Sequence, residues 1–440
     1  MKNTSMPPPL VLFQRTRLRF PAFAIQALLA LIALQLPVVG YCDSGNGWFK
    51  NLFESKGKNM KELVLTREVI IKDESGFVPE PHVMSRTDDG GFIIAGSLGR
   101  AWAIKINTAG KVLWRNLQPP PRADGGYAAV FTGIVAMPDG STYLCGNMSL
   151  PEGYTPSLLI HLDAAGHLID EQIFAPQKRS EHGISYFDDC VRWGDGVALI
   201  GHVHDTKRQA SGYGAGFLPP ITEQYYWLVM LDAAGKIKWE KQIPTAFDTI
   251  DEAQSILVSD SSLVLAGYRM GNTELFRISA TGELSAKKNP VDGFFAFVRP
   301  IVPDGVLQLY GLNQTNKSFE SITLDDRFEE IKRVQGDHGL DFGGRFVYRM
   351  PDQSLVLFGG ELHERYKSAV AHLDSKLQSV QKIELVHGAQ FYDGSYIGAA
   401  APTGNDGEFV TVKPLTKHQP DEGRIGLAPV GLSLYFFQVK

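Results

Sequence analysis

Three short runs stand close together early in this 440-residue chain: GGFIIAG at residues 90–96, AWAIKIN at 101–107 and AGKVLW at 109–114. The same order returns as DGVALIG at 195–201, WLVMLD at 227–232 and AGKIKW at 234–239. Weaker copies recur at a period of about 40–60 residues, which is typical of repeat folds. They lie at residues 139–166, 263–282, 304–325, 351–374 and 406–439.

Each repeat predicts four short β-strands. An Asp-Gly or Gly-Gly pair between two apolar runs predicts a hairpin turn, because glycine tolerates positive φ. The third run ends in Asn or Asp, and the x-Gly pair that follows predicts a second tight turn. Four antiparallel strands per repeat form one blade of a β-propeller. The sequence therefore predicts an all-β, seven-bladed propeller. Because the last repeat is irregular, six or eight blades remain open.

The seven repeats also predict how the ring closes. We expect the innermost strands to begin near His82, Gly133, Asp189, Ala253, Ala296, Arg345 and Ser395. The segment 62–71 precedes the first repeat and has the pattern of a strand. It is expected to supply the outer strand of blade seven, so that no open edge remains.

The repeats resemble the bacterial exported propeller repeats of the quinoprotein-like and WD40-like kind. The resemblance rests on an apolar strand ending in Asn or Asp, a glycine turn and a strand carrying Trp, as in Ile106-Asn107 to Trp114 and Leu231-Asp232 to Trp239. It extends over residues 63–440 and implies the fold. Quinone-dependent dehydrogenases also carry an adjacent Cys-Cys pair and a calcium site; this sequence has neither, so no cofactor is expected.

The N-terminus has the pattern of a targeting segment. Arg15, Arg17 and Arg19 precede an apolar run at residues 20–39, and small residues allow cleavage before Tyr41. The run is also long enough for a membrane span, so a cleaved signal and an uncleaved anchor both remain open. Tyr41 stands where a lipoprotein signal needs a small residue before Cys42. We expect residues 1–42 as signal or anchor, 43–61 as a linker and 62–440 as the propeller.

Charge and cysteine content limit the partners and the compartment. The net charge of −5 gives no basic excess for a nucleic-acid backbone. Export places the protein in the periplasm or outside the cell, or tethers it to the inner membrane through residues 20–39. Apart from Cys42 the cysteines are Cys145 and Cys190, either two small buried residues or a disulfide, since exported proteins keep disulfides.

Loop length indicates which face carries function. The turns between the first and second and the third and fourth strands of each repeat are short. The other connections are long and unequal, and long loops on a rigid scaffold often carry function. The prominent ones are 148–156, 202–224, 361–367 and 413–424.

Candidate binding residues lie on this long-loop face. The longest loop contributes His202, His204, Tyr213 and Phe217, and the strand starts near the channel mouth contribute acidic residues and one arginine. These last are Asp188, Asp189, Asp251, Glu252, Arg345 and Asp393, with Glu361 on another loop. His202 and His204 would point the same way on a continued strand, as metal ligands do, but no third ligand is evident and no metal is expected. The acidic residues have an ordinary alternative role as turn formers.

Two functions fit these features. The favoured one is a monomeric, non-catalytic binding module that engages another envelope or secreted protein, as a scaffold, inhibitor or immunity-type protein. The alternative is a periplasmic hydrolase or lyase acting on a glycan or small metabolite with the acidic residues at the channel mouth. Carboxylates and a histidine converging in one pocket would favour the enzyme.

Overall fold

A computed structural model gives the fold of the 440-residue chain. It describes residues 61–72, 80–97, 101–117, 129–149, 155–174, 184–206, 221–244, 251–259, 262–269, 272–288, 295–301, 306–313, 318–336, 343–360, 368–385, 391–392, 397–421 and 424–440. The chain divides into two units. The first, residues 1–44 and 211–217, lies wholly outside the described residues, and the second contains the propeller.

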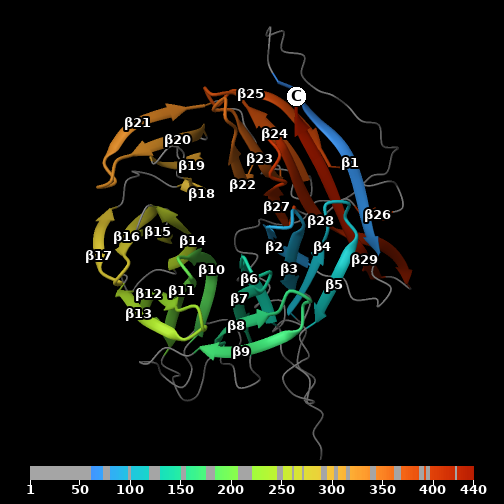
Figure 1. Cartoon of the computed structure of the whole chain (residues 1–440). Helices are drawn as coiled ribbons and strands as arrows, with labels where there is room; N and C mark the ends of the chain where they lie inside the picture. Colours follow the sequence, from blue (N-terminus) through green and yellow to red (C-terminus); the bar gives the residue numbers. More distant parts are fainter. Residues whose placement is uncertain are drawn as a thin grey trace, which may run out of the picture. The chain divides into compact units, whose positions relative to one another are not determined.

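The propeller consists of seven antiparallel sheets in a ring (Figure 1). Blade one is β2 (Glu80–Arg86), β3 (Phe92–Ser97), β4 (Ala101–Ile106) and β5 (Val112–Leu117). Blade two is β6 (Ala129–Ala136), β7 (Thr142–Met148), β8 (Ser157–Leu162) and β9 (Leu168–Phe174). Blade three is β10 (Ile184–Trp193), β11 (Gly196–Thr206), β12 (Ile221–Leu231) and β13 (Ile237–Pro244).

The later blades repeat the same order. Blade four is β14 (Asp251–Ser259), β15 (Ser262–Arg269), β16 (Asn272–Ser279) and β17 (Leu284–Lys288). Blade five is β18 (Phe295–Ile301), β19 (Leu307–Asn313), β20 (Ser318–Leu324) and β21 (Glu330–Gln335). Blade six is β22 (Gly343–Arg349), β23 (Leu355–Gly360), β24 (Ser368–Leu373) and β25 (Ser379–Glu384). Blade seven is β26 (Phe391–Tyr392), β27 (Ala399–Pro402), β28 (Glu408–Asp421), β29 (Arg424–Val439) and β1 (Leu63–Lys72).

The predicted closing strand is confirmed. β1 pairs antiparallel with β29, from Leu63 opposite Val439 to Lys72 opposite Gly431. Blade six holds the start of β1 as well: the side chain of Gln381 accepts a hydrogen bond from Leu63 N at 2.7 Å and donates one to Leu63 O at 2.9 Å. The N-terminal strand therefore completes blade seven and closes the ring.

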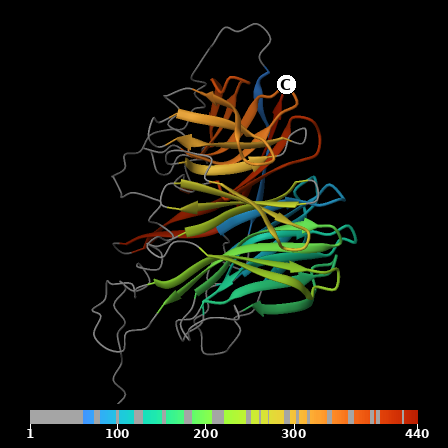
Figure 2. The same ribbon diagram turned by 90° about the vertical axis from the view of Figure 1, so that its left-hand side faces the viewer.

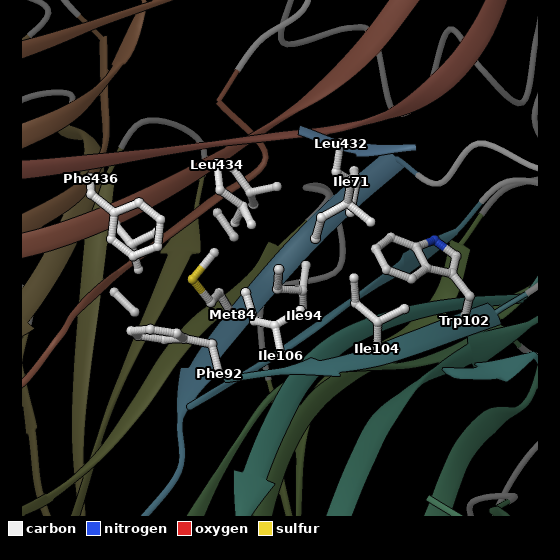
Figure 3. Close-up of a cluster of buried hydrophobic side chains, with 14 residues drawn as sticks. Ile71, Met84, Phe92, Ile94, Trp102, Ile104, Ile106, Leu432, Leu434 and Phe436 are labelled. Carbon is white, nitrogen blue, oxygen red and sulfur yellow. The ribbon is translucent and has the colours of Figure 1, made fainter. Parts of the chain in front are cut away.

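The hydrophobic core is divided among the seams between blades. Seven clusters of buried side chains occur in the described part of the chain, and each joins two neighbouring blades. Figure 3 shows the cluster between blades seven and one, where Leu434 and Ile71 meet Met84 and Trp102. Each Å² of apolar surface buried on folding contributes about 25 cal/mol to stability. The seams between blades are therefore the main source of stability of the propeller.

The repeated Asp and Asn residues cap the turns between the third and fourth strands. Oδ1 of Asp163 accepts hydrogen bonds from the backbone N of Ala165 and His167 at 2.9 and 2.8 Å. Gly166 follows with a φ of 83°, which glycine adopts without strain. In blades five and six Phe328 and Leu377 occupy this glycine position, both at a φ of 62°, so the turn survives where its glycine signature is lost.

The Trp and Gly of the repeat signature meet across blades. A β-carbon on Gly166 would lie 2.6 Å from the ring of Trp114, and one on Gly282 would lie 3.1 Å from the ring of Trp239. Trp239 also donates from Nε1 to the backbone O of Ala280 at 3.1 Å. The tryptophan on an outer strand thus covers the turn of the next blade, as expected of packing residues.

Blade seven departs from the sequence-based expectation. The predicted loop 413–424 is wrong, because nearly all of it is strand in β28 and β29. These strands have 14 and 16 residues, whereas those of blade one have 6 or 7. Their hairpin reaches past the ends of neighbouring strands (Figure 2). The inner strand is split into β26 and β27, so it begins at Phe391 and resumes at Ala399 rather than starting near Ser395.

Two other expectations concern the longest predicted loop and the N-terminal segment. The loop 202–224 is shorter than predicted, because β11 continues to Thr206 and β12 begins at Ile221. The targeting segment at residues 1–42 lies outside the described residues. Within the described ranges, no helix is long and apolar enough to cross a membrane.

Candidate functional site

The innermost strands share a β-bulge near their first residues. The register between first and second strand shifts at the same place in blades one to six, on the side of the long connections. A bulge turns a side chain away from the regular alternation and is common beside binding sites. The residues skipped in the register are His82, Thr132, Asp188, Gln254, the pair Phe297 and Val298, and Arg345.

The bulge of blade three forms a carboxylate–imidazole pair. Oδ2 of Asp188 lies 2.6 Å from Nδ1 of His202, and the two side chains are 19% and 9% exposed. The ring of Tyr186 lies beside the imidazole, with centroids 4.9 Å apart. His202 stands opposite Tyr186 on one side and Tyr226 on the other. Two predicted site residues are therefore brought into direct contact.

The neighbouring acidic residue has a structural contact. Asp189 accepts hydrogen bonds from the backbone N of Cys190 at 2.8 Å and of Ile256 at 3.3 Å. Ile256 belongs to blade four, so this carboxylate joins two inner strands. Thr132 acts similarly one blade earlier, donating from Oγ1 to the backbone O of Phe187 at 2.6 Å.

The other predicted site residues are placed less fully. Asp251, Glu252 and Arg345 lie on the inner strands β14 and β22, and His204 lies on β11 two residues after His202. For these four only the backbone belongs to the described structure. Four residues lie outside the described residues altogether: Tyr213, Phe217, Glu361 and Asp393.

The sequence reasoning missed a row of polar pairs at one repeat position, in each of which the member on the third strand is buried. Trp227 donates from Nε1 to Oε1 of Glu240 at 2.9 Å in blade three. At the matching position Glu274 lies 3.6 Å from Nζ of Lys287 in blade four. Glu320 lies 3.2 Å from Nη1 of Arg333 in blade five. The available signal was the charge on the third strand of blades four and five, where blades one, two, three and six carry Trp102, Leu158, Trp227 and Ala369.

Glu274 and Glu320 are each only 1% exposed. Glu320 also accepts hydrogen bonds from Asn313 Nδ2 at 3.1 Å and Ser318 Oγ at 2.9 Å. A buried carboxylate is tolerated when it is paired and hydrogen-bonded in this way. Both carboxylates therefore contact polar groups of their own blade.

The resolved pKa shifts fall mainly on the short-turn face. A hydrogen bond from Lys105, with a second from Thr87, lowers the pKa of Asp89 to about 2. Burial lowers the pKa of His161, whose ring stacks on Tyr143 with centroids 4.0 Å apart, and burial raises the pKa of that tyrosine. These perturbations have structural causes and lie away from the Asp188–His202 pair.

The Asp188–His202 pair can hold a proton on Nδ1 and orient the imidazole, the arrangement found in acid–base dyads. Metal binding needs more ligands. In the ranges covered by the structure, no three His, Cys, Asp or Glu side chains gather as a metal site would require. The described face thus offers one oriented imidazole rather than a converging set of carboxylates.

Comparison with known proteins assigns no family to this chain. No protein-family model and no curated protein matches the sequence. Among solved structures, the dihydro-heme d1 dehydrogenase NirN has 16% identity over 87% of this chain and 75% of its own, with a TM-score of 0.46. The Dos1 propeller has 12% identity over 86% and 95% at 0.44, and puromycin hydrolase has 11% over 77% and 51% at 0.47. Likeness at this level carries no function.

Proposed function

We propose that this chain is an exported, non-catalytic binding module that holds another envelope or secreted protein. The observation that carries the proposal is the hairpin of β28 and β29. We call its outer part, residues 416–421 of β28 and 424–430 of β29, the blade-seven arm. Export is supported by the sequence pattern of residues 15–41.

The arm has the geometry of a docking element. Within the described residues, β1 pairs with β29 as far as Gly431, and β26 pairs with β28 at Thr416 and Lys417. Among the described strands, residues Arg424–Pro429 of β29 therefore pair with β28 alone. A two-stranded hairpin of this kind is marginally stable by itself and presents backbone donors and acceptors along its edge. An extended segment of a partner protein would add a strand there.

The other side chains on this face fit a binding surface better than a reaction centre. Asp189 and Thr132 are engaged in hydrogen bonds between blades. Only one described carboxylate meets His202, so the convergence that an enzyme would need is not met by the described groups.

The test is site-specific cross-linking in the envelope of the native host. A photoreactive amino acid is placed at position 427 in the arm and, as matched control, at exposed Lys376 on a short turn. We expect one discrete protein adduct at position 427 and none at 376. Equal adducts at both positions, or none at either, would refute docking through the arm.

A second variant tests the need for the arm. Residues 416–430 are replaced by Asn-Gly, a two-residue hairpin turn that leaves Leu415 facing Gly431. The partner found by cross-linking should no longer co-purify, although the ring still closes through β1. Full retention of that partner would count against the proposal.

The Asp188–His202 pair favours a second candidate, a hydrolase or lyase acting on an envelope glycan. Asp188 would orient the imidazole, and His202 would act as general acid or base. The variants Asp188→Asn and His202→Gln should lower glycan turnover by about 100-fold or more if this is so. Absence of turnover by the parent protein on a panel of envelope glycans would eliminate this candidate.

A further inference from the structure

Two cysteines from neighbouring blades meet at the seam between blades two and three. Cys145 lies on β7, the second strand of blade two, and Cys190 lies on β10, the innermost strand of blade three. Both are buried, at 0% and 6% exposure, in the same hydrophobic cluster. In the structure both are free thiols.

The two sulfur atoms share one small space. A β-carbon on Gly133 would lie 2.5 Å from Sγ of Cys145 and 2.7 Å from Sγ of Cys190. Each distance is shorter than ordinary contact, so both sulfurs occupy the space that any other residue at 133 would fill. Burial, together with a hydrogen bond between the two thiols, raises the pKa of Cys145.

The position of Gly133 explains why the sulfurs meet across the seam. Gly133 follows the bulge of blade two, and Asp189 follows the bulge of blade three. Asp189 reaches across to the backbone of Ile256 in the next blade. Gly133 faces blade three in the same way, since its absent β-carbon would also lie 2.8 Å from the backbone N of Cys190. Without a side chain there, Cys145 approaches Cys190 directly.

We propose that Cys145 and Cys190 form a disulfide that joins blade two to blade three when the protein folds in an oxidising compartment. Two thiols lose two protons and two electrons and one S–S bond forms. The electrons reduce a disulfide oxidant, such as oxidised glutathione, to two thiols. The exchange passes through a mixed disulfide with one cysteine, which the other cysteine then attacks.

Burial of the two thiols determines the stage of folding at which the disulfide forms. Exchange requires a thiolate, and a buried thiol with a raised pKa seldom ionises. Cys145 and Cys190 are 0% and 6% exposed, so an oxidant in solution reaches neither sulfur readily in the folded protein. The cross-link therefore forms during folding, before the seam closes, and the folded thiol form resists oxidation.

The test uses the full chain with Cys42→Ser, so that only the pair can react. The protein is unfolded, then refolded with either oxidised or reduced glutathione, and digested without reduction. We expect a peptide joined through Cys145 and Cys190 only after oxidised refolding, with a mass lower by two hydrogen atoms. The same oxidant added to the folded thiol form should give little of this peptide within hours.

Stability supplies a second readout. The oxidised Cys42→Ser protein should melt about 5 °C above its reduced form. The matched variants with Cys145→Ala or Cys190→Ala should melt at the same temperature in both conditions. Recovery of both cysteines as separate alkylated peptides after oxidised refolding would overturn the proposal, whatever the melting temperatures.

Discussion

Replacing Glu320 by alanine is expected to destabilise the propeller strongly. The carboxylate is 1% exposed and accepts from Asn313, Ser318 and Arg333 at 2.9–3.2 Å. Removing one partner of a buried pair costs about 3–5 kcal/mol. Arg333 is 31% exposed and keeps its bond to Glu330, so the expected loss lies near the low end, about 3 kcal/mol.

The matched control is Glu330→Ala. It removes a carboxylate from the same arginine, which it contacts at 2.7 Å, but Glu330 is 38% exposed. A solvent-exposed ion pair contributes about 0–1 kcal/mol. The free energy of unfolding of both variants is measured by urea denaturation at neutral pH, with the m-value checked against that of the parent.

The comparison of the two losses in unfolding free energy, for Glu320→Ala and for Glu330→Ala, tests this prediction. Equal losses in the two variants would refute the view that the buried contacts of Glu320 dominate. A loss below about 1 kcal/mol for Glu320→Ala would have the same meaning, since that is the scale of a surface contact.

Three further predictions concern other parts of the ring. Asp89→Asn should cost about 1 kcal/mol at pH 7, after allowance for solvent screening, and the difference should vanish as the pH falls from about 4 through 2, where parent Asp89 becomes protonated; a difference that persists in acid would contradict this. Burial lowers the pKa of His372 below its ordinary 6.5. As the pH falls below 6.5, the imidazole therefore takes up a proton more readily in the unfolded state than in the folded state, and the free energy of unfolding decreases. His372→Gln should therefore flatten the fall in melting temperature below pH 6.5, and an unchanged slope would disprove it. Leu63→Ala should cost about 2–5 kcal/mol by chemical denaturation, whereas Leu65→Ala at a half-buried position should cost less; equal costs would contradict the closing role of this residue.

The fold was predictable because the turn residues and apolar runs recur in register. Asp163 and Gly166 form the turn between the third and fourth strands of blade two, and their counterparts form the same turn in other blades. A short sequence pattern therefore identifies each blade. The prediction was least accurate in blade seven. There β28 and β29 continue through residues rich in Pro and Gly, which by themselves favour a loop.

The candidate site was predictable only in part. The pair of Asp188 and His202 was among the expected residues, but its contact depends on a bulge that has no sequence signature. His82, Thr132 and Asp188 occupy the same bulge position in their blades, but their side chains have no chemical property in common that would mark it. Glu320 and Ser321 are consecutive polar residues, which by themselves favour an exposed position; the burial of Glu320 is accompanied by hydrogen bonds within blade five that the sequence does not indicate.

The pairing of β1 with β29 has a consequence for how the protein is made. Leu63 lies opposite Val439, so the first strand of the ring has no partner until β29 has left the ribosome. Contacts this distant in sequence are slow to form, because the entropy of closing a long loop is lost before the contact is gained. Blades one to six can assemble as they emerge, while β1 waits with an open edge. Synthesis of β29 is thus the step that allows the ring to close, and a chain interrupted before β29 would leave the edges of β1 and β28 unpaired and open to proteolysis.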